Sequence, residues 1–386
     1  MSSPYKHLFS LPDGLHYLNC AYMAPLSRRV ADAGRAAIER LEAPSRIQVP
    51  DFFEHSDAAR RLFARLINVA DHRRIAIIPS VSYAMATVAK NLRMQSDQNI
   101  VVVEEQFPSN VYSWRRACAD AGAELRTVAA PHTEGTLAGA WNDATVAAID
   151  HRTALVTVPQ LHWTDGTRFD LDEIGQRARA CGARLVIDGT QSVGAVPLDC
   201  ERLRPDVVAC AGYKWLTGPY AAGLAFFGSA YDDGVPLEEN WITREGSEDF
   251  AGLIRYRDEY QPGAIRYDVG ERSNFVLLPM LCAALEQVVE WGPETVSAYT
   301  RELLSGAVPQ LRELGCRVED DAGRAPHLMG VRVPTGLDVA SLARELARRQ
   351  VSVSVRGNVI RVAPHLYNEP DDVTALVAVI REARSS

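Results

Sequence analysis

Residues 184–191 read RLVIDGTQ, and residues 207–216 read VVACAGYKWL. Each stretch opens with a short apolar run rich in β-branched residues and closes with polar ones, which is typical of a buried strand followed by a loop. In an open α/β sheet, ligands bind beyond the carboxyl ends of the strands. The polar residues that follow these two strands are therefore the first candidates for a functional site.

Further apolar runs of the same kind flank these stretches. The sequence predicts additional strands at 73–80, 99–107, 153–161 and 223–229. It predicts helices at 81–92 and 171–182, the second with Asp170 as its N-cap and Gly182 as its stop signal. Strands that alternate with helices indicate a mostly parallel sheet covered on both faces. The last two strands, 206–210 and 223–228, are joined without a helix, so we expect part of the sheet to be antiparallel.

The pattern changes after residue 228. A loop-rich stretch is followed by a predicted long helix near 275–291, another near 293–314, and a short region of strands and helix. This change predicts a second, smaller α+β domain at the C-terminal end, with the join near Pro262-Gly263.

Bulk properties exclude several classes of protein. The net charge is −8 and no Lys/Arg tract is present, which argues against a nucleic-acid partner. No apolar run approaches the roughly 20 residues that span a bilayer, and the first ten residues lack the pattern of a secretion signal. Seven scattered cysteines without a CxxC pair favour reduced thiols in the cytoplasm over a zinc site or disulfides.

Two residues at neighbouring strand ends, Asp188 and Lys214, suggest a specific chemistry. Taken alone, Asp188 is typical of a turn or helix cap, and Lys214 of a side chain that reaches the surface. Together they can face each other across one cleft. A partly desolvated lysine has a lowered pKa and can form a Schiff base, and an aspartate can keep a pyridine nitrogen protonated. The pair therefore points to pyridoxal phosphate (PLP).

Residues 186–195 (VIDGTQSVGA) and 211–226 (AGYKWLTGPYAAGLAF) resemble the class V aminotransferase group of fold-type-I PLP enzymes. That group includes cysteine desulfurases, kynureninases and isopenicillin N epimerase-like proteins. Five more segments resemble it in family order, at 17–27, 79–92, 104–114, 162–171 and 361–373. The resemblance implies an α/β fold with a large, mostly parallel seven-stranded sheet domain at 26–262. It also implies a smaller α+β domain formed by 1–25 and 263–386, and a homodimer with shared active sites.

The resemblance also assigns residues to the cofactor. It implies that Lys214 carries the Schiff base, that Asp188 partners the pyridine nitrogen, and that Gln191 hydrogen-bonds the phenolic oxygen. Val81 and Ser82 match the phosphate-binding turn, where a helix begins and attracts an anion. Ser80 beside them could instead be a simple N-cap. Tyr213 resembles the tyrosine of the kynureninase Tyr-Lys pair, and its hydroxyl could reach the phosphate.

The remaining assignments concern the substrate, the cofactor ring and a neighbouring subunit. Arg361 matches the arginine that binds the substrate α-carboxylate, and Asn19 and Tyr22 lie in the N-terminal stretch that approaches the substrate in relatives. His162 is a candidate for contact with the cofactor ring, although the alignment places Gln160 there. Asn274 ends the segment 270–274, which resembles the loop that reaches the phosphate in a neighbouring subunit.

The expected reaction begins with an external aldimine, after which the freed Lys214 abstracts the proton from Cα. No cysteine lies shortly before Arg361, which argues against a persulfide-forming desulfurase. Cys20 could be a reactive thiol but is more typical of a small buried residue. We expect a small amino acid as substrate and place C–S β-elimination narrowly ahead of transamination, with epimerisation third. A PLP-binding regulatory domain is the alternative outside enzymes.

Overall fold

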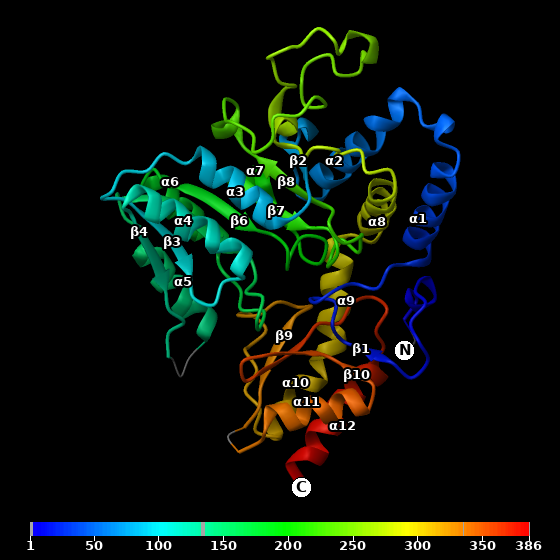
Figure 1. The fold of residues 1–386 in the computed structure, drawn as a ribbon. Helices are drawn as coiled ribbons and strands as arrows, with labels where there is room; N and C mark the ends of the chain where they lie inside the picture. The colour runs from blue at the N-terminus through cyan, green and yellow to red at the C-terminus, as the bar shows by residue number, and fades with distance from the viewer. Residues whose placement is uncertain (1–2, 133–135, 335, 386) are drawn as a thin grey trace.

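The computed structural model describes residues 3–132, 136–334 and 336–385. Its centre is a seven-stranded sheet in the order β2-β8-β7-β6-β5-β3-β4 (Figure 1). The strands are β2 (Ile75–Ile78), β3 (Asn99–Val103), β4 (Glu124–Val128), β5 (Thr153–Pro159), β6 (Arg184–Asp188), β7 (Val207–Ala211) and β8 (Gly223–Phe227). The strands from β4 to β7 are parallel, and β8 runs antiparallel to both β7 and β2. The predicted mostly parallel seven-stranded sheet is confirmed.

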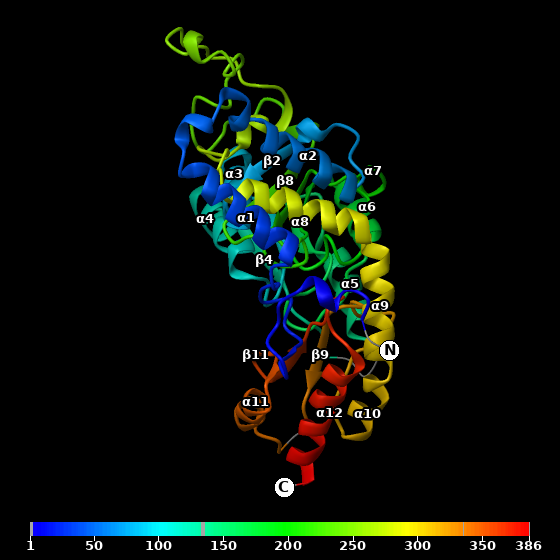
Figure 2. The same ribbon diagram turned by 90° about the vertical axis from the view of Figure 1, so that its right-hand side faces the viewer.

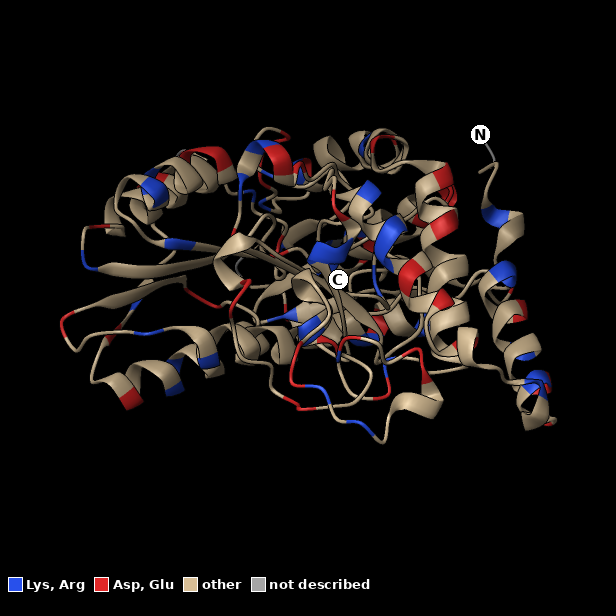
Figure 3. Cartoon of the chain, turned by 90° about the horizontal axis from the view of Figure 1, so that it is seen from above, with Lys and Arg blue, Asp and Glu red and all other residues tan. Residues whose placement is uncertain are grey.

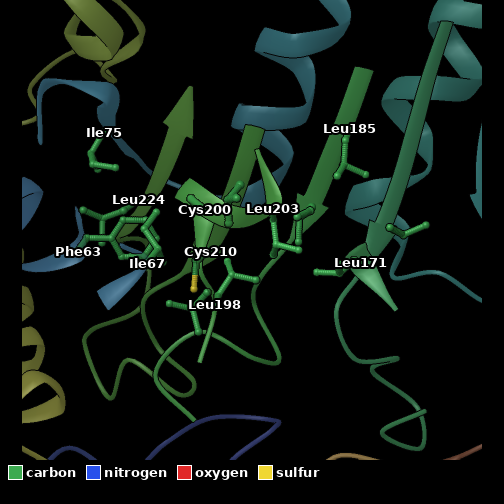
Figure 4. Close-up of a cluster of buried hydrophobic side chains, with 14 of the residues drawn as sticks. Phe63, Ile67, Ile75, Leu171, Leu185, Leu198, Cys200, Leu203, Cys210 and Leu224 are labelled. Carbon is green, nitrogen blue, oxygen red and sulfur yellow. The ribbon is translucent and has the colours of Figure 1, made fainter. Parts of the chain in front are cut away.

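Both faces of this sheet are covered by helices. Helices α2 (Glu54–Leu66), α5 (Leu137–Ala148), α6 (Leu171–Ala180), the short α7 (Cys200–Leu203) and α8 (Leu277–Trp291) contribute to one face, and α3 (Val81–Asn91) and α4 (Tyr112–Ala121) to the other. Alternate residues of a strand enter different cores, as Ile77 and Ile78 do in β2. Figure 4 shows Phe63, Ile67 and Leu224 together in the first core. Strands buried on both faces explain the continuous apolar runs in the sequence.

Helix α6 begins and ends where the sequence predicts. The Asp170 side chain accepts hydrogen bonds from the backbone N–H groups of Asp172 and Glu173. Gly182, just beyond the helix, has a φ of +76°, a conformation that glycine adopts without strain. These two residues set the length of the helix between β5 and β6.

A second group of elements lies below the large sheet in Figure 1. Strands β9 (Met329–Arg332), β11 (Ser354–Arg356) and β12 (Val359–Val362) form an antiparallel sheet in the order β11-β12-β9. β1 (His16–Tyr17) pairs in parallel with β10 (Val351–Ser352). The helices of this group are α9 (Pro293–Ser305), α10 (Ala307–Glu313), α11 (Val339–Arg348) and α12 (Pro370–Ser385). The N-terminal segment thus packs beside the C-terminal one.

Short 3₁₀ helices lie in the connections, at Lys6–Leu8, Pro44–Arg46, Val49–Phe52, His72–Arg74, Pro108–Asn110, Ser229–Tyr231, Phe250–Gly252 and Gly263–Tyr267. Helix α1 (Arg28–Leu41) follows the N-terminal segment and packs with α2 against α8, as Figure 2 shows for α1 and α8. Although α8 follows the predicted join at Pro262-Gly263, its Leu281 and Leu285 belong to the core of the large sheet. The division into domains at that join stays a prediction.

The described residues also bear on the questions of a membrane span, a metal site and disulfides. Among the described residues, no helix is long and apolar enough to cross a membrane, and no group of three or more potential ligands could hold a metal ion. All seven cysteines are free. Seen from above, basic and acidic residues are interspersed over the chain (Figure 3).

Candidate functional site

A cavity of about 200 Å³ lies at the carboxyl ends of β5, β6 and β7. It is lined by Pro79, Ser80, Val81, Gln106, Phe107, Ser109, Pro159, Leu161, Trp163, Asp188, Thr190, Gln191, Ala211, Tyr213, Lys214, Tyr220, Ala221 and Ala222. Asp188, Gln191 and Lys214, which the sequence predicts to act together, share this cavity. The position agrees with the general rule for ligand sites in open α/β sheets.

Lys214 follows β7 and is buried, with 6% of its surface exposed. Burial lowers the pKa of its amine to about 8, and the nearby charge of Arg361 acts in the same direction. Its Nζ atom lies 5.3 Å from the centre of the Phe107 ring and 5.6 Å from that of Tyr213. An amine with this pKa is readily available in its neutral, nucleophilic form.

Asp188 is the last residue of β6 and is also buried. Its Oδ1 accepts a hydrogen bond from the backbone N–H of Thr190 at 3.0 Å. Burial raises the pKa of its carboxyl group, while bonds from Thr190 and the charge of Lys214 oppose the rise. A buried carboxylate of this kind gains from a cationic N–H partner, such as a protonated ring nitrogen.

Gln191 forms hydrogen bonds to three separate parts of the chain. Its Nε2 donates to the carbonyl oxygen of Ala21 at 3.2 Å, and its Oε1 accepts from Trp215 Nε1 at 2.9 Å. Its backbone carbonyl accepts from His327 Nε2 at 2.8 Å. Gln191 is therefore rigidly placed at the wall of the cavity.

The N-terminus of α3 opens onto the cavity through Ser80 and Val81. Ser80 caps the helix, since its Oγ accepts from the Tyr83 N–H at 3.3 Å, and it lies 2.8 Å from the Ser82 hydroxyl. Ser82 is exposed and does not line the cavity. The free N–H groups and dipole of such a helix end attract an anion such as phosphate, so capping and anion binding are compatible here.

Two tyrosines, Tyr213 and Tyr220, form part of the cavity wall. Their ring centres are 4.6 Å apart. Burial raises the pKa of the Tyr213 hydroxyl, so this group remains a hydrogen-bond donor at neutral pH.

Arg361, in β12, is 1% exposed and lies close enough to Lys214 to affect its charge. Its Nη1 donates to the Trp163 carbonyl at 2.9 Å and its Nη2 to Ser354 Oγ at 3.5 Å. Burial lowers the pKa of its guanidinium to about 9, so it stays charged at pH 7. Among the described residues no carboxylate forms an ion pair with it, which leaves a buried cation suited to an anionic ligand.

The two N-terminal candidates lie outside the cavity lining. Asn19 is linked to Arg361 through Ser354. Its Oδ1 accepts a hydrogen bond from Ser354 Oγ at 2.8 Å, and that oxygen accepts one from Arg361. Tyr22 is 56% exposed. Cys20, between them, is fully buried, burial raises the pKa of its thiol, and its Sγ lies 4.0 Å from the Lys214 carbonyl. It is a buried residue, and no cysteine lines the cavity.

The structure does not bring His162 to the cavity. Its ring nitrogens are bonded, Nδ1 to Thr164 Oγ1 at 2.7 Å and Nε2 to the Glu104 carbonyl at 3.1 Å. Gln160 is also absent from the lining, and its Nε2 donates to the Pro197 carbonyl at 3.2 Å. Neither residue lines the cavity in this structure.

Phe107, which the sequence analysis did not single out, lines the cavity, and its ring centre lies 5.3 Å from the Lys214 Nζ. Its ring packs edge-on against Trp163, with centres 5.3 Å apart. Phe107 belongs to the segment 104–114, which resembles the family, and that resemblance was the signal that could have found it.

Asn274 lies elsewhere, in a groove of about 680 Å³ between α1, α2 and α8. Its Oδ1 accepts from the N–H groups of Val276 and Leu277 at the start of α8. This groove is larger than the cavity at Lys214, but it contains neither that lysine nor Asp188.

The groups present in the cavity fit PLP. Gln106 Nε2 is buried against the cavity and has no hydrogen-bond partner, so it offers an unused donor. The helix end at Val81 suits the phosphate, the carboxylate of Asp188 the ring nitrogen, and the amine of Lys214 the aldehyde. Each polar part of the cofactor thus has a chemically matched group.

Comparison with known proteins agrees with this fit. The family model "Aminotransferase class-V" matches residues 48–376. The uncharacterized aminotransferase YcbU of Bacillus subtilis is 27% identical over 322 residues, 83% of this chain and 81% of the relative. Isopenicillin N epimerase of Streptomyces clavuligerus is 28% identical over 332 residues, 82% of each.

Among solved structures, the cystine C–S lyase C-DES in complex with cysteine persulfide superimposes with a TM-score of 0.84. Its sequence identity is 20%, over 95% of this chain and 97% of that one, so the likeness concerns the fold. The family match covers most of the chain and the cavity holds the groups that its cofactor needs. The chain therefore belongs to the class-V aminotransferase family and is a PLP-dependent enzyme.

Proposed function

We propose that this enzyme removes the α-proton of a small amino acid and expels a sulfur substituent from its β-carbon, as a C–S β-lyase without a persulfide cysteine. The observation that carries the proposal is the buried Lys214 amine, with a pKa of about 8, in one cavity with Asp188 and close to Arg361. This arrangement supplies a base and a carboxylate in the cavity, and a carboxylate-binding cation, Arg361, that lies outside its lining but near enough to lower the pKa of Lys214.

Bound in the cavity, PLP supplies the aldehyde that takes up an amine and the ring that delocalises the electron pair left at the α-carbon. Lys214 would hold the cofactor through its aldehyde, and its amine, when free, would accept the α-proton of the substrate. Asp188 keeps a proton on the ring nitrogen, and Gln191 donates to the phenolic oxygen. Arg361 holds the substrate α-carboxylate through its planar guanidinium.

The phosphate contacts and the ring contact come from other residues. Ser80 and Val81, which line the cavity, would hold the phosphate at the start of α3, with the backbone N–H of Ser82 and the Tyr213 hydroxyl as further donors. Phe107 takes the ring contact first assigned to His162. Asn19 orients Arg361 through Ser354, and Tyr22 stands at the exposed side of the site.

Two observations favour elimination of sulfur. The first is that no cysteine lines the cavity, so no thiol is placed to accept sulfur as a persulfide. The second is the aromatic wall of Phe107, Trp163 and Tyr220, which suits an apolar sulfur substituent and limits the access of water. The fold is also that of a protein named a cystine C–S lyase. Transamination and epimerisation would use the same base. Both stay as alternatives, because one relative is named an aminotransferase and another an epimerase.

An amino-acid panel that includes S-substituted cysteines tests the reaction. We expect pyruvate, ammonia and a thiol to form in equal amounts from the S-substituted cysteines, without any keto acid in the assay. Strict dependence on a keto-acid acceptor would instead indicate an aminotransferase. Loss of an α-deuterium label with no net product would indicate an epimerase.

We also propose that the chain forms a homodimer, because Asn274 lies in a wide groove away from its own cavity. The seven free thiols support a reducing, cytoplasmic location. The proposed large domain is 26–262 and the small one 1–25 with 263–386.

A further inference from the structure

The side chain of Gln191 is held between two partners that water does not reach. Its Oε1 accepts from Trp215 Nε1 at 2.9 Å, and its Nε2 donates to the Ala21 carbonyl at 3.2 Å. Gln191 is 4% exposed and Trp215 is completely buried. His327 packs edge-on against the Trp215 ring, with centres 4.2 Å apart, and holds the Gln191 backbone at the same time.

Both partners require the same orientation of the amide. An indole N–H can only donate a hydrogen bond, and a backbone carbonyl can only accept one. If the amide were reversed, its NH₂ group would face the indole N–H and its oxygen would face the Ala21 carbonyl. Both hydrogen bonds would be lost in a buried place, where an unsatisfied donor or acceptor is strongly unfavourable.

We propose that Trp215 is a positioning residue, which orients Gln191 so that the second N–H of its amide, and not its oxygen, is available to the cofactor. The inference rests on the proposed function, in which Gln191 faces the phenolic oxygen. Gln191 lines the cavity with Asp188 and Lys214, and one of its two Nε2 hydrogens is already used by Ala21. The remaining hydrogen is the only donor that the amide has left.

This orientation has a consequence for Lys214. A negative charge on the phenolic oxygen favours a proton on the cofactor-linked Nζ of Lys214. A hydrogen-bond donor to that oxygen stabilises the charge and so weakens its hold on the proton. Fixing the amide as a donor therefore lowers the pKa of that nitrogen. Trp215 follows Lys214 in the chain, but among the described contacts its indole N–H bonds Gln191 and not the lysine amine, so the N–H acts on that nitrogen through Gln191.

An isosteric change at Trp215 tests the proposal. In the holoenzyme, 3-benzothienylalanine at this position keeps the two-ring shape and removes only the N–H. We expect the pH midpoint of the visible absorption band, which reports the proton on Nζ, to rise by about one to two units. Trp215→Phe, which also removes the N–H, should shift it in the same direction. The charged and titratable groups that act on Lys214 (Arg361, Asp188, Cys210 and Arg356) are unchanged in both variants.

Trp141 provides the matched control. It is buried and donates its indole N–H to the Val128 carbonyl at 3.0 Å, but it does not line the cavity. The same analogue at Trp141 removes a hydrogen bond of the same kind and should leave the midpoint where it is. An equal shift at both positions would mean that the effect is a general loss of stability, and would overturn the proposal.

Gln191→Leu separates this inference from the proposed function. The Gln191→Leu variant alone should raise the pH midpoint of the visible absorption band. Adding the Trp215 analogue to this variant should not raise the midpoint further, because Trp215 acts through Gln191. A midpoint that responds to Gln191→Leu but not to the Trp215 analogue would overturn the positioning role and leave the proposed function intact. A midpoint that ignores Gln191→Leu would overturn the contact of Gln191 with the cofactor and, with it, the role of Trp215.

Discussion

Arg361 is the residue on which substrate binding depends in this account. Its guanidinium is buried, fixed by Trp163 and Ser354, and without a carboxylate partner among the described residues. Arg361→Lys keeps the charge but loses the planar fork, so we expect KM to rise about ten- to hundredfold with a smaller change in kcat. Steady-state kinetics with the best substrate of the panel measure this split.

Arg177 offers a control for the same substitution. It lies in α6, donates to the Ile149 carbonyl and is remote from the cavity. Arg177→Lys should leave KM unchanged. A fall in kcat with an unaltered KM in Arg361→Lys would contradict a role in binding the carboxylate.

We expect His365 to make the stability of the protein sensitive to acid. It is completely buried, neither ring nitrogen has a hydrogen-bond partner, and burial lowers its pKa to about 3. In the unfolded chain a histidine takes up a proton below about pH 6.5. Because the folded state does not take up this proton until about pH 3, the free energy of unfolding falls as the pH drops from about 6.5 towards 3. One such group lowers it by up to about 1.4 kcal/mol per pH unit.

We expect His365→Phe to flatten this dependence, since phenylalanine can keep the stacking on Trp215 and Tyr367 without binding a proton. Urea unfolding at several pH values between 4 and 7 measures the slope. His7→Phe, at an exposed position, is the control. A slope that stays the same in His365→Phe would show that this histidine does not govern acid stability.

At the residue scale, the sequence predicts which polar residues end an apolar strand and so belong to the site. It does not predict which side chains of a loop face the cavity. Asp188 and Lys214 each follow an apolar strand, which places both at one edge of the sheet. Leu161 and Trp163 line the cavity while His162 between them does not, a difference that the sequence alone does not reveal. Phe107 escaped notice because a phenylalanine in a loop reads as an ordinary core residue.

At the scale of elements, the start of α3 has two roles: Ser80 caps the helix, and the same helix end is proposed to bind the phosphate. Ser80→Ala removes the cap that accepts from the Tyr83 N–H, so we expect a loss of stability of about 1 kcal/mol. Because the same helix end is proposed to hold the phosphate, the affinity of the apoenzyme for PLP should fall as well. Thermal unfolding and fluorescence titration with PLP measure the two effects.

Asp170→Ala separates these effects, because Asp170 caps α6 and lies away from the cavity. It should destabilise the protein similarly without weakening the binding of PLP. Equal affinities for PLP in the two variants would contradict the phosphate site at α3.

Most elements were predictable because strands buried on both faces leave unbroken apolar runs. Strand β4 was missed, since it lies at the edge of the sheet and carries Glu124 and Arg126 on partly exposed positions. The helix predicted over 293–314 is two helices, α9 and α10, which meet at Gly306. Pro309 explains the break, because it has no N–H to bond the Ser305 carbonyl and its ring crowds that group.

At the scale of the whole molecule, the proposed homodimer predicts that two inactive variants restore each other. Asn274→Asp keeps an oxygen for the N–H groups of Val276 and Leu277 but sets a negative charge against the phosphate of the neighbouring subunit. Lys214→Ala removes the base. Activity should reappear when the two are mixed and allowed to exchange subunits, because one site of the mixed dimer is then intact. Continued inactivity, with exchange verified by co-purification of differently tagged subunits, would contradict shared sites.

The central claim is that Lys214 carries the cofactor, and the chain makes this unusually simple to test. It contains three lysines, of which Lys6 pairs with Glu369 at the surface and Lys90 donates to the Pro236 carbonyl. The decisive measurement is borohydride reduction of the yellow holoenzyme followed by peptide mapping. The account predicts a pyridoxyl group on Lys214 alone, and a label on Lys6 or Lys90 with Lys214 unmodified would contradict it.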